Sequence, residues 1–353
     1  MATIKDVAKV AGVSISTVSR ALSEKIYVNP ETKQRVMQAV DELGYRPNML
    51  AKGLKEGKTR TIGLLIPDIT NLYYARVMQN IEKYAVKNGY SLLLSNTNED
   101  VGQEILAVDM LKERLVDGMI IIPSTSDIQH FLALQADGIP FVMLNRRFQD
   151  DINCVSNDQR GGAYDAVKYL IEHGHRKISV VLRSFQKQIY QDRYEGCMEA
   201  LYEHGLQDSE RYFLLNVDTI EDSRCQAIEM LKREDRPTVF FVTNDMLVFG
   251  IYSAVSALNM NIPQDVSVMG FDNLPTSPYL VPPLTTYEHA LEKIAGEAFR
   301  TLMRQINHKQ KIAEKIFLRG SIITRESVRT IYHDVKTEVD SAVLVEKRHT
   351  VSR

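Results

Sequence analysis

The sequence predicts an α/β protein with a small all-helical segment at its N-terminus. Two observations lead to this fold class. Before residue 46, apolar residues recur at helical spacing in three short stretches. After residue 60, apolar runs typical of buried parallel strands alternate with helical patterns, and this alternation occurs in two successive series. Two such series predict two doubly wound lobes built on parallel sheets.

The bulk composition is that of a soluble globular protein. The 353 residues suffice for at least two domains, and 44% of them are hydrophobic and 25% charged. There is neither an apolar run of about 18 residues nor a signal-peptide pattern, so we expect a cytoplasmic protein without a membrane partner. The three cysteines are expected to stay reduced thiols.

Charge is distributed unevenly along the chain. Residues 1–60 contain eleven Lys and Arg against six Asp and Glu, a net charge of +5. Because the whole chain carries −2, residues 61–353 carry −7. A basic segment attached to an acidic body is typical of a polyanion-binding module joined to a separate domain.

The stretch TIKDVAKVAGVSISTVSRAL, residues 3–22, predicts two short helices joined by a turn. Thr3 and Asp6 have the spacing of a capping box, Gly12 suits the turn, and Ser14 is a typical N-cap. This is the pattern of a helix-turn-helix, whose second helix reads the major groove, although an ordinary helical hairpin with a polar face fits it equally well. The residues expected to contact DNA are Thr3, Ser14, Ile15, Ser16, Thr17, Ser19 and Arg20.

A third helix follows, which favours the helix-turn-helix interpretation. Asn29 and Pro30 form an N-cap with proline at the first helical position, and Gly44 ends the helix. Its apolar face, Val36 with Ala39, can close a small core against the first two helices.

The two α/β series can be placed along the chain by their apolar runs. Strands are expected at 61–68, 91–97, 119–123, 141–145, 177–182, 238–245 and 266–272. Helices are expected at 71–88, 102–117, 127–137, 161–173, 190–204, 222–233, 246–258 and 291–306. The late segments 284–289 and 314–324 are expected to cross back between the lobes.

Polar and aromatic residues follow several of these strands. Ligands of doubly wound sheets bind beyond the carboxyl ends of the strands, so these residues are candidates for a small, hydroxyl-rich ligand. They are Asp68, Asn71, Tyr73, Tyr74, Asn145, Arg146, Asn244 and Asp272, and Arg193 at the start of a helix is a further candidate. Asn71 can instead cap its helix, the two tyrosines can be packing residues, and Asp245 is better explained as a charge at a helix N-terminus.

No pattern of catalytic or metal-binding residues is present. His173 and His175 flank a glycine that is typical of a helix C-cap, which is a better explanation than metal binding. There is no glycine-rich phosphate loop, and neither a nucleophile elbow nor a pair of carboxylates on one element stands out. We therefore expect no enzymatic activity, no cofactor and no metal.

Taken together, several motifs resemble the lactose/galactose repressor (LacI/GalR) family of bacterial transcription regulators. The motifs are TIKDVAKVAGVSISTVSRAL, NPETKQRVMQAVDELGYRPNMLAKGL, TRTIGLLIPDITNLYY, VTNDMLVFG, IPQDVSVMGFDN and PPLTTYEH, and the resemblance runs from residue 2 to about 328. It implies a homodimeric repressor of carbohydrate-use genes that binds inverted-repeat operator DNA. It also implies allosteric control by a sugar, sugar acid or sugar phosphate bound between two lobes similar to periplasmic sugar-binding proteins.

The resemblance implies a division of the chain and roles for particular residues. It divides the chain into a headpiece at 1–46, a hinge helix at 47–60, a core at 61–330 and a tail at 331–353. Lobe 1 is expected at about 61–157 and 290–316, and lobe 2 at about 158–289 and 317–330. The implied effector contacts are Asn145, Arg193, Asn244, Asp272 and His289, the last a departure because Gln is common there. The implied hinge contacts to DNA are Asn48, Ala51, Lys52, Leu54 and Lys55.

Alternatives remain for the linker, the tail and the function. Gly53 and Gly57 make the linker a poor helix in isolation, so it is either a flexible basic tether or a helix that orders on DNA. The tail lacks a leucine heptad and is either disordered or contains a strand. A sugar-transport binding protein would require a signal peptide and no helical head, and this chain has the opposite features.

Overall fold

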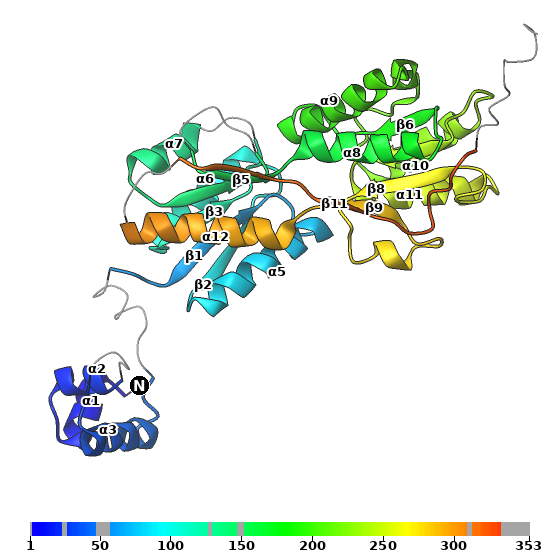
Figure 1. Ribbon diagram of the computed structural model, residues 1–353. Helices are drawn as coiled ribbons and strands as arrows, with labels where there is room; N and C mark the ends of the chain where they lie inside the picture. Colours follow the sequence, from blue (N-terminus) through cyan, green and yellow to red (C-terminus); the bar gives the residue numbers. More distant parts are fainter. Residues whose placement is uncertain are drawn as a thin grey trace, which may run out of the picture. The chain divides into compact units, whose positions relative to one another are not determined.

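The computed structural model describes residues 2–22, 27–46, 57–125, 129–146, 152–308 and 313–332 (Figure 1). The chain divides into two compact units. One contains Met1–Thr61 with Leu115–Asp117, and its first 46 residues are called the headpiece below. The other, the sensor unit, contains Ile62–Arg114 and Gly118–Arg353. Within the described ranges, no helix has both the length and the apolar character needed to cross a bilayer.

The headpiece contains the three predicted helices, α1 (Ile4–Ala11), α2 (Ile15–Ala21) and α3 (Pro30–Glu42). The predicted capping box is confirmed, since Thr3 N donates to Asp6 Oδ2 at 2.8 Å and Asp6 N donates to Thr3 Oγ1 at 3.4 Å. Gly12 takes the left-handed φ of 66° that the turn requires. The small core consists of Val7, Ala8, Ala11, Val18, Ala21, Val36 and Ala39.

The first lobe has a six-stranded sheet in the order β10-β5-β4-β3-β1-β2, and helices cover both of its faces (Figure 1). Its strands are β1 (Thr61–Ile66), β2 (Ser91–Asn96), β3 (Gly118–Ile121), β4 (Phe141–Leu144), β5 (Cys154–Asn157) and β10 (Lys315–Leu318). Its helices are α5 (Leu72–Lys87), α6 (Val101–Glu113), α7 (Gln129–Ala136) and α12 (Leu291–His308). The pairings β1–β3, β3–β4, β4–β5 and β5–β10 are all parallel, which agrees with the predicted parallel sheet.

The second lobe has a five-stranded sheet in the order β11-β9-β8-β7-β6. Its strands are β6 (Ile178–Val181), β7 (Val239–Val242), β8 (Ser267–Phe271), β9 (Thr285–Glu288) and β11 (Ser321–Ile323). Its helices are α8 (Gln159–Glu172), α9 (Gln188–Glu203), α10 (Ile220–Leu231) and α11 (Asp245–Ala257), with short 3-10 turns at Gln207–Tyr212 and Ser277–Tyr279. Strands β6 to β9 are parallel, and β11 is antiparallel to β9.

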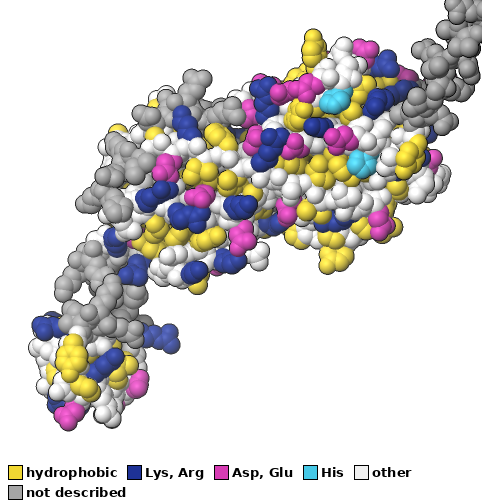
Figure 2. Space-filling view, in the orientation of Figure 1, with side chains coloured by type: hydrophobic (Ala, Val, Ile, Leu, Met, Phe, Trp, Pro, Cys, Tyr) yellow, Lys and Arg dark blue, Asp and Glu magenta, His cyan; other side chains and the backbone are white. Residues whose placement is uncertain are grey.

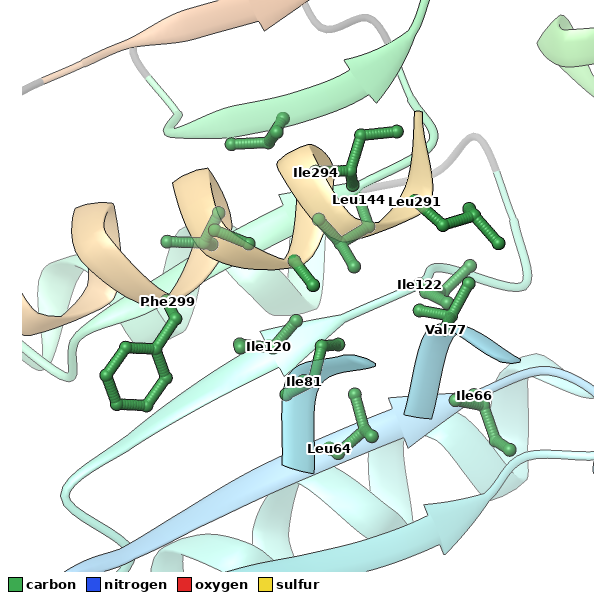
Figure 3. Close-up of a cluster of buried hydrophobic side chains, with 14 of the residues drawn as sticks. Leu64, Ile66, Val77, Ile81, Ile120, Ile122, Leu144, Leu291, Ile294 and Phe299 are labelled. Carbon is green, nitrogen blue, oxygen red and sulfur yellow. The ribbon is translucent and has the colours of Figure 1, made fainter. Parts of the chain in front are cut away.

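The core of the first lobe joins residues that are distant in sequence (Figure 3). Leu64 and Ile120 on the sheet face Ile81 of α5, and Ile294 and Phe299 of α12 pack into the same cluster. Each such buried side chain contributes about 1.5–3 kcal/mol of transfer free energy. The late chain therefore completes the first lobe before it runs through β10 into the second lobe at β11 (Figure 1).

The structure differs from the sequence predictions in two elements. The helix expected at 102–117 ends at Glu113, because Leu115 takes a left-handed φ of 54°. The strand β5 was not predicted, since its polar Ser156 and Asn157 break the apolar pattern although both are buried. The linker residues 47–56 and the tail residues 333–353, which contain the proposed hinge helix and strand, lie outside the described residues.

Candidate DNA interface and effector cleft

The outward face of α2 is available to a ligand. Ser16, Ser19 and Arg20 are exposed, and Thr17 is half-buried. Ile15 is 44% exposed although it is apolar. A side chain of this kind can contact a thymine methyl group, and the hydroxyl and guanidinium groups beside it can contact base edges and phosphates.

Ser14 has a structural role in addition to any contact with DNA. Its Oγ accepts a hydrogen bond from Thr17 N at 3.2 Å and lies 2.8 Å from the hydroxyls of both Ser16 and Thr17. These bonds cap α2 and hold three hydroxyl groups together at its N-terminus. Thr3, in the same way, caps α1 and is exposed.

The end of the linker is held by an aspartate that the sequence analysis did not identify. Asp117 Oδ1 accepts from Thr59 N at 2.6 Å, and Oδ2 accepts from Arg60 N at 3.0 Å. Thr59 Oγ1 also donates to Leu115 O at 2.8 Å. The described part of the linker is therefore fixed to the turn between α6 and β3. The linker residues expected to contact DNA, Asn48, Ala51, Lys52, Leu54 and Lys55, lie outside the described residues.

A cleft lies between the two lobes of the sensor unit, at the carboxyl ends of their strands. It is lined by Pro67, Asn71, Tyr73, Tyr74, Ile122, Pro123, Asn145, Arg146, Gln159, Lys187, Ile189, Tyr190, Arg193, Asn244 and Asp272. The structure thus brings together eight of the ten residues that we expected to bind an effector. Asp68 and His289 are outside this lining, and Asp68 binds the backbone and hydroxyl of Thr70 instead.

On the first-lobe wall, amide groups surround a buried phenol. The Tyr73 hydroxyl accepts from Asn145 Nδ2 at 2.8 Å and from Asn157 Nδ2 at 3.1 Å. Burial raises the pKa of Tyr73, so the phenol keeps its proton and can donate it. Asn71 both lines the cleft and caps α5 by accepting from Tyr73 N at 3.0 Å, so the two interpretations of this residue are compatible.

On the second-lobe wall, Arg193 is fixed in place by its own contacts. Its Nε donates to Gln159 Oε1 at 2.8 Å, and an NH1 hydrogen bond goes to Thr243 O. The guanidinium carbon lies 4.6 Å from the ring centre of Phe271 and 5.4 Å from that of Tyr190. A planar cation held this rigidly can bind a polar ligand with little further loss of side-chain entropy.

His289 lies next to the Asp272 carboxylate, on the side away from the cleft. Their Oδ1 and Nε2 atoms are 3.3 Å apart, without the alignment of a hydrogen bond. Burial lowers the pKa of His289, which favours the neutral imidazole. Its ring packs edge-on against Tyr73 at 5.6 Å and Phe271 at 4.9 Å. His289 therefore contacts the residues that line the cleft rather than lining it itself.

Asp245 organises the loop that carries Asp272. Its carboxylate accepts hydrogen bonds from Phe271 N at 2.7 Å, Ser277 Oγ at 2.8 Å, Thr286 Oγ1 at 3.0 Å and Leu274 N at 3.1 Å. Burial, followed by the nearby charge of Asp272, raises the pKa of Asp245 to about 6. Asp245 is the first residue of α11, as expected, but the sequence analysis missed its contacts to the loop.

Hydrogen bonds and ion pairs between side chains of the two lobes lie around the cleft. Arg76 of α5 donates to the carbonyl of Asp272 at 3.2 Å and to Glu288 Oε1 at 3.1 Å. Lys187 Nζ lies 2.5 Å from Glu99 Oε1 across the cleft. These pairs lie on segments far apart in sequence, so local patterns carried no signal for them.

The described residues contain no group of three or more His, Cys, Asp or Glu side chains placed to hold a metal ion. His175 is buried, with Nε2 donating to the carbonyl of Arg329 at 3.1 Å. On the face of the sensor unit drawn in Figure 2, basic and acidic side chains are interspersed instead of being separated by sign.

Comparison with known proteins gives two family matches. Residues 3–48 match the family of bacterial regulatory proteins, lacI family, and residues 59–325 match the periplasmic binding proteins and sugar binding domain of LacI family. The HTH-type transcriptional repressor PurR of Vibrio vulnificus strain CMCP6 is 34% identical over 334 residues, which are 94% of this chain and 100% of that protein.

Solved structures support the same relationship. The lac repressor dimer bound to operator and the anti-inducer ONPF has a TM-score of 0.84 and 25% identity, covering 93% of this chain and 99% of that one. A LacI family transcriptional regulator from Enterococcus faecium with bound ribose has a TM-score of 0.69 and 27% identity, covering 77% of this chain and 100% of that one.

Proposed function

This chain belongs to the LacI family of bacterial regulatory proteins, and we propose that it couples a small polar effector in the cleft to operator binding by the headpiece. It is a DNA-binding transcriptional repressor with a ligand-binding sensor domain, and not an enzyme. The proposal concerns the effector, its site and its control of DNA binding.

The observation that supports the effector site best is the composition of the cleft. Hydrogen-bonding groups from both lobes converge there, namely Asn145 and Tyr73 from the first lobe and Arg193, Asn244 and Asp272 from the second. A ligand that bonds to both walls favours one relative position of the lobes over others, and this differential affinity is what shifts a conformational equilibrium. Such a shift can reach the DNA-binding segment through the linker, whose end is bonded to Asp117.

The effector class that we propose is sugar-like, and the genes are those for carbohydrate use. Amides and a carboxylate suit hydroxyl groups, and tyrosine rings suit the apolar face of a sugar. The structure from Enterococcus faecium contains ribose. Planar rings can also stack on tyrosine, and the name PurR shared by the curated relatives adds purine bases as the competing class.

For the DNA partner, we propose an inverted-repeat operator bound by a homodimer in the cytoplasm. The lac repressor relative is a dimer on its operator. The net charge of +5 on residues 1–60 supports phosphate contacts, so affinity should fall steeply as salt rises. In this proposal Leu54 enters the minor groove at the operator centre, with Lys52 beside it.

The test combines a ligand screen with a DNA-binding readout. The operator is first selected from random DNA, and a thermal-shift screen then compares sugars, sugar acids, sugar phosphates and purine bases. Each ligand that stabilises the protein is titrated into the protein–operator complex, and operator release or retention is followed by fluorescence anisotropy. We expect a stabilising ligand to change operator affinity at least severalfold. If stabilising ligands leave operator affinity unchanged, the coupling proposal is wrong.

A further inference from the structure

Basic side chains outnumber acidic ones in the lining of the cleft. Three of them are basic, Arg146, Lys187 and Arg193, and only Asp272 is acidic. Lys187 is neutralised by Glu99, 2.5 Å away. Arg193 donates to Gln159 and Thr243 and stacks on an aromatic ring. Arg146 has no comparable set of partners.

Arg146 is a buried cation with an unused donor. Its side chain belongs to a residue only 6% exposed, and one guanidinium nitrogen donates to Pro123 O at 3.0 Å. Its Nε has no hydrogen-bond partner, and no carboxylate of the described residues forms an ion pair with it. A buried charge without a countercharge is costly, and burial lowers the pKa of Arg146 accordingly.

The nearby buried carboxylate does not serve as this countercharge. Glu104 acts on Arg146 only at a distance, because its two oxygens are used elsewhere. One lies 2.8 Å from His130 Nε2, and the other accepts from Ser124 N at 2.5 Å. Glu99 likewise pairs with Lys187. Arg146 therefore lines the cleft with no ion pair to a carboxylate of the described residues.

We propose that Arg146 is an anion subsite of the cleft, so that the effector carries a phosphate or carboxylate group whose oxygen accepts from the guanidinium of Arg146. This inference rests on the proposed function, because it assumes that the effector binds in this cleft. Guanidinium groups bind such anions through short, charge-assisted hydrogen bonds. The remaining polar lining then recognises the body of the effector, and Arg146 discriminates against its neutral counterpart.

The test compares matched neutral and anionic probes. Calorimetry on the full chain would use ribose with ribose 5-phosphate for the phosphate arm, glucose with gluconate for the carboxylate arm, and inorganic phosphate alone. We expect at least one anion to bind more tightly than its neutral partner. Arg146→Gln should weaken that anion about 10- to 100-fold, the usual effect of losing a charged hydrogen bond. Arg160→Gln is the matched control, because Arg160 lies outside the lining and pairs with Glu199 at the surface.

The outcomes separate this inference from the function on which it rests. If a neutral sugar or a purine controls operator binding and Arg146→Gln behaves like wild type, the function stands and the anion subsite is wrong. If an anion binds through Arg146 without changing operator affinity, the subsite stands and the effector proposal is wrong. Binding of no anionic probe to the wild-type protein, or equal weakening by Arg160→Gln, also contradicts the subsite. Operator binding by Arg146→Gln shows that the variant is folded.

Discussion

Replacing Arg193 by alanine is expected to separate effector response from DNA binding. The change leaves two buried acceptors, Gln159 Oε1 and Thr243 O, without this donor, and each unsatisfied group costs about 1–3 kcal/mol. Loss of the contact with Phe271 adds about 0.5–2 kcal/mol. The second lobe should thus lose about 2.5–8 kcal/mol of stability. At about 2–4 °C per kcal/mol, the Tm should fall by roughly 5–30 °C.

Arg193→Ala should weaken the binding of the effector by a larger factor than the binding of operator DNA. Losing one charged hydrogen bond of about 1.5–3 kcal/mol weakens effector binding about 10- to 150-fold. Fluorescence anisotropy with labelled operator, with and without the effector, measures both affinities in one experiment. Arg160→Ala is the control, since its exposed ion pairs with Glu199 and Glu195 contribute at most about 1 kcal/mol. Wild-type effector sensitivity in Arg193→Ala would refute the assignment of the cleft.

Three further predictions concern the headpiece, the linker and pH. Thr3→Ala removes one half of the capping box and should cost about 1 kcal/mol of headpiece stability. Hydrogen exchange in α1 of the full chain should then be roughly fivefold faster, and unchanged exchange would contradict the role of the cap. Leu54→Ala should weaken specific operator binding far more than non-specific binding and reduce the DNA bend measured by fluorescence transfer, whereas an undiminished bend would favour a plain tether. Burial lowers the pKa of His175 from 6.5 to about 4. As pH falls, this histidine is therefore protonated in the unfolded chain before it is protonated in the folded chain. The free energy of unfolding should consequently decrease by up to about 3 kcal/mol between pH 6.5 and 4. Denaturant titrations of wild type and His175→Gln should differ in this pH dependence, and identical curves would contradict the prediction.

Local signals in the headpiece sequence were sufficient to predict its structure. Capping and turn formation depend on residues within four positions of one another, as for Thr3 with Asp6 and for Ser14 with Thr17. The left-handed backbone at Gly12 is likewise a property of one residue. These interactions do not depend on distant parts of the chain, so they can be predicted from the local sequence.

The sequence predicted which strand ends form the cleft, but not which side chains line it. The rule that ligands bind beyond the carboxyl ends of parallel strands located Asn145, Asn244 and Asp272. The family resemblance added His289, which does not line the cleft but packs against Tyr73 and Asp272, two of the residues that line it. That distinction depends on side-chain packing across the sheet, which no spacing in the sequence encodes.

Contacts between distant segments were not predictable. The Asp117 carboxylate meets Thr59 across 58 positions, and Arg76 meets Glu288 across 212. The strand β5 was not predicted because its buried residues include polar ones. These are stabilised by hydrogen bonds to distant residues, such as that from Asn157 to the Tyr73 hydroxyl. Such features follow from the assembled fold and carry no periodic signal of their own.

Thermodynamic linkage provides the most direct test of effector control. The dissociation constant of the effector is measured by calorimetry for the free protein and for the protein saturated with operator. If the cleft and the headpiece are coupled, the two constants must differ by the same factor by which the effector changes operator affinity. We predict a difference of at least fivefold, which Asp272→Asn should abolish together with effector binding. Equal dissociation constants in the presence and absence of operator would contradict the account.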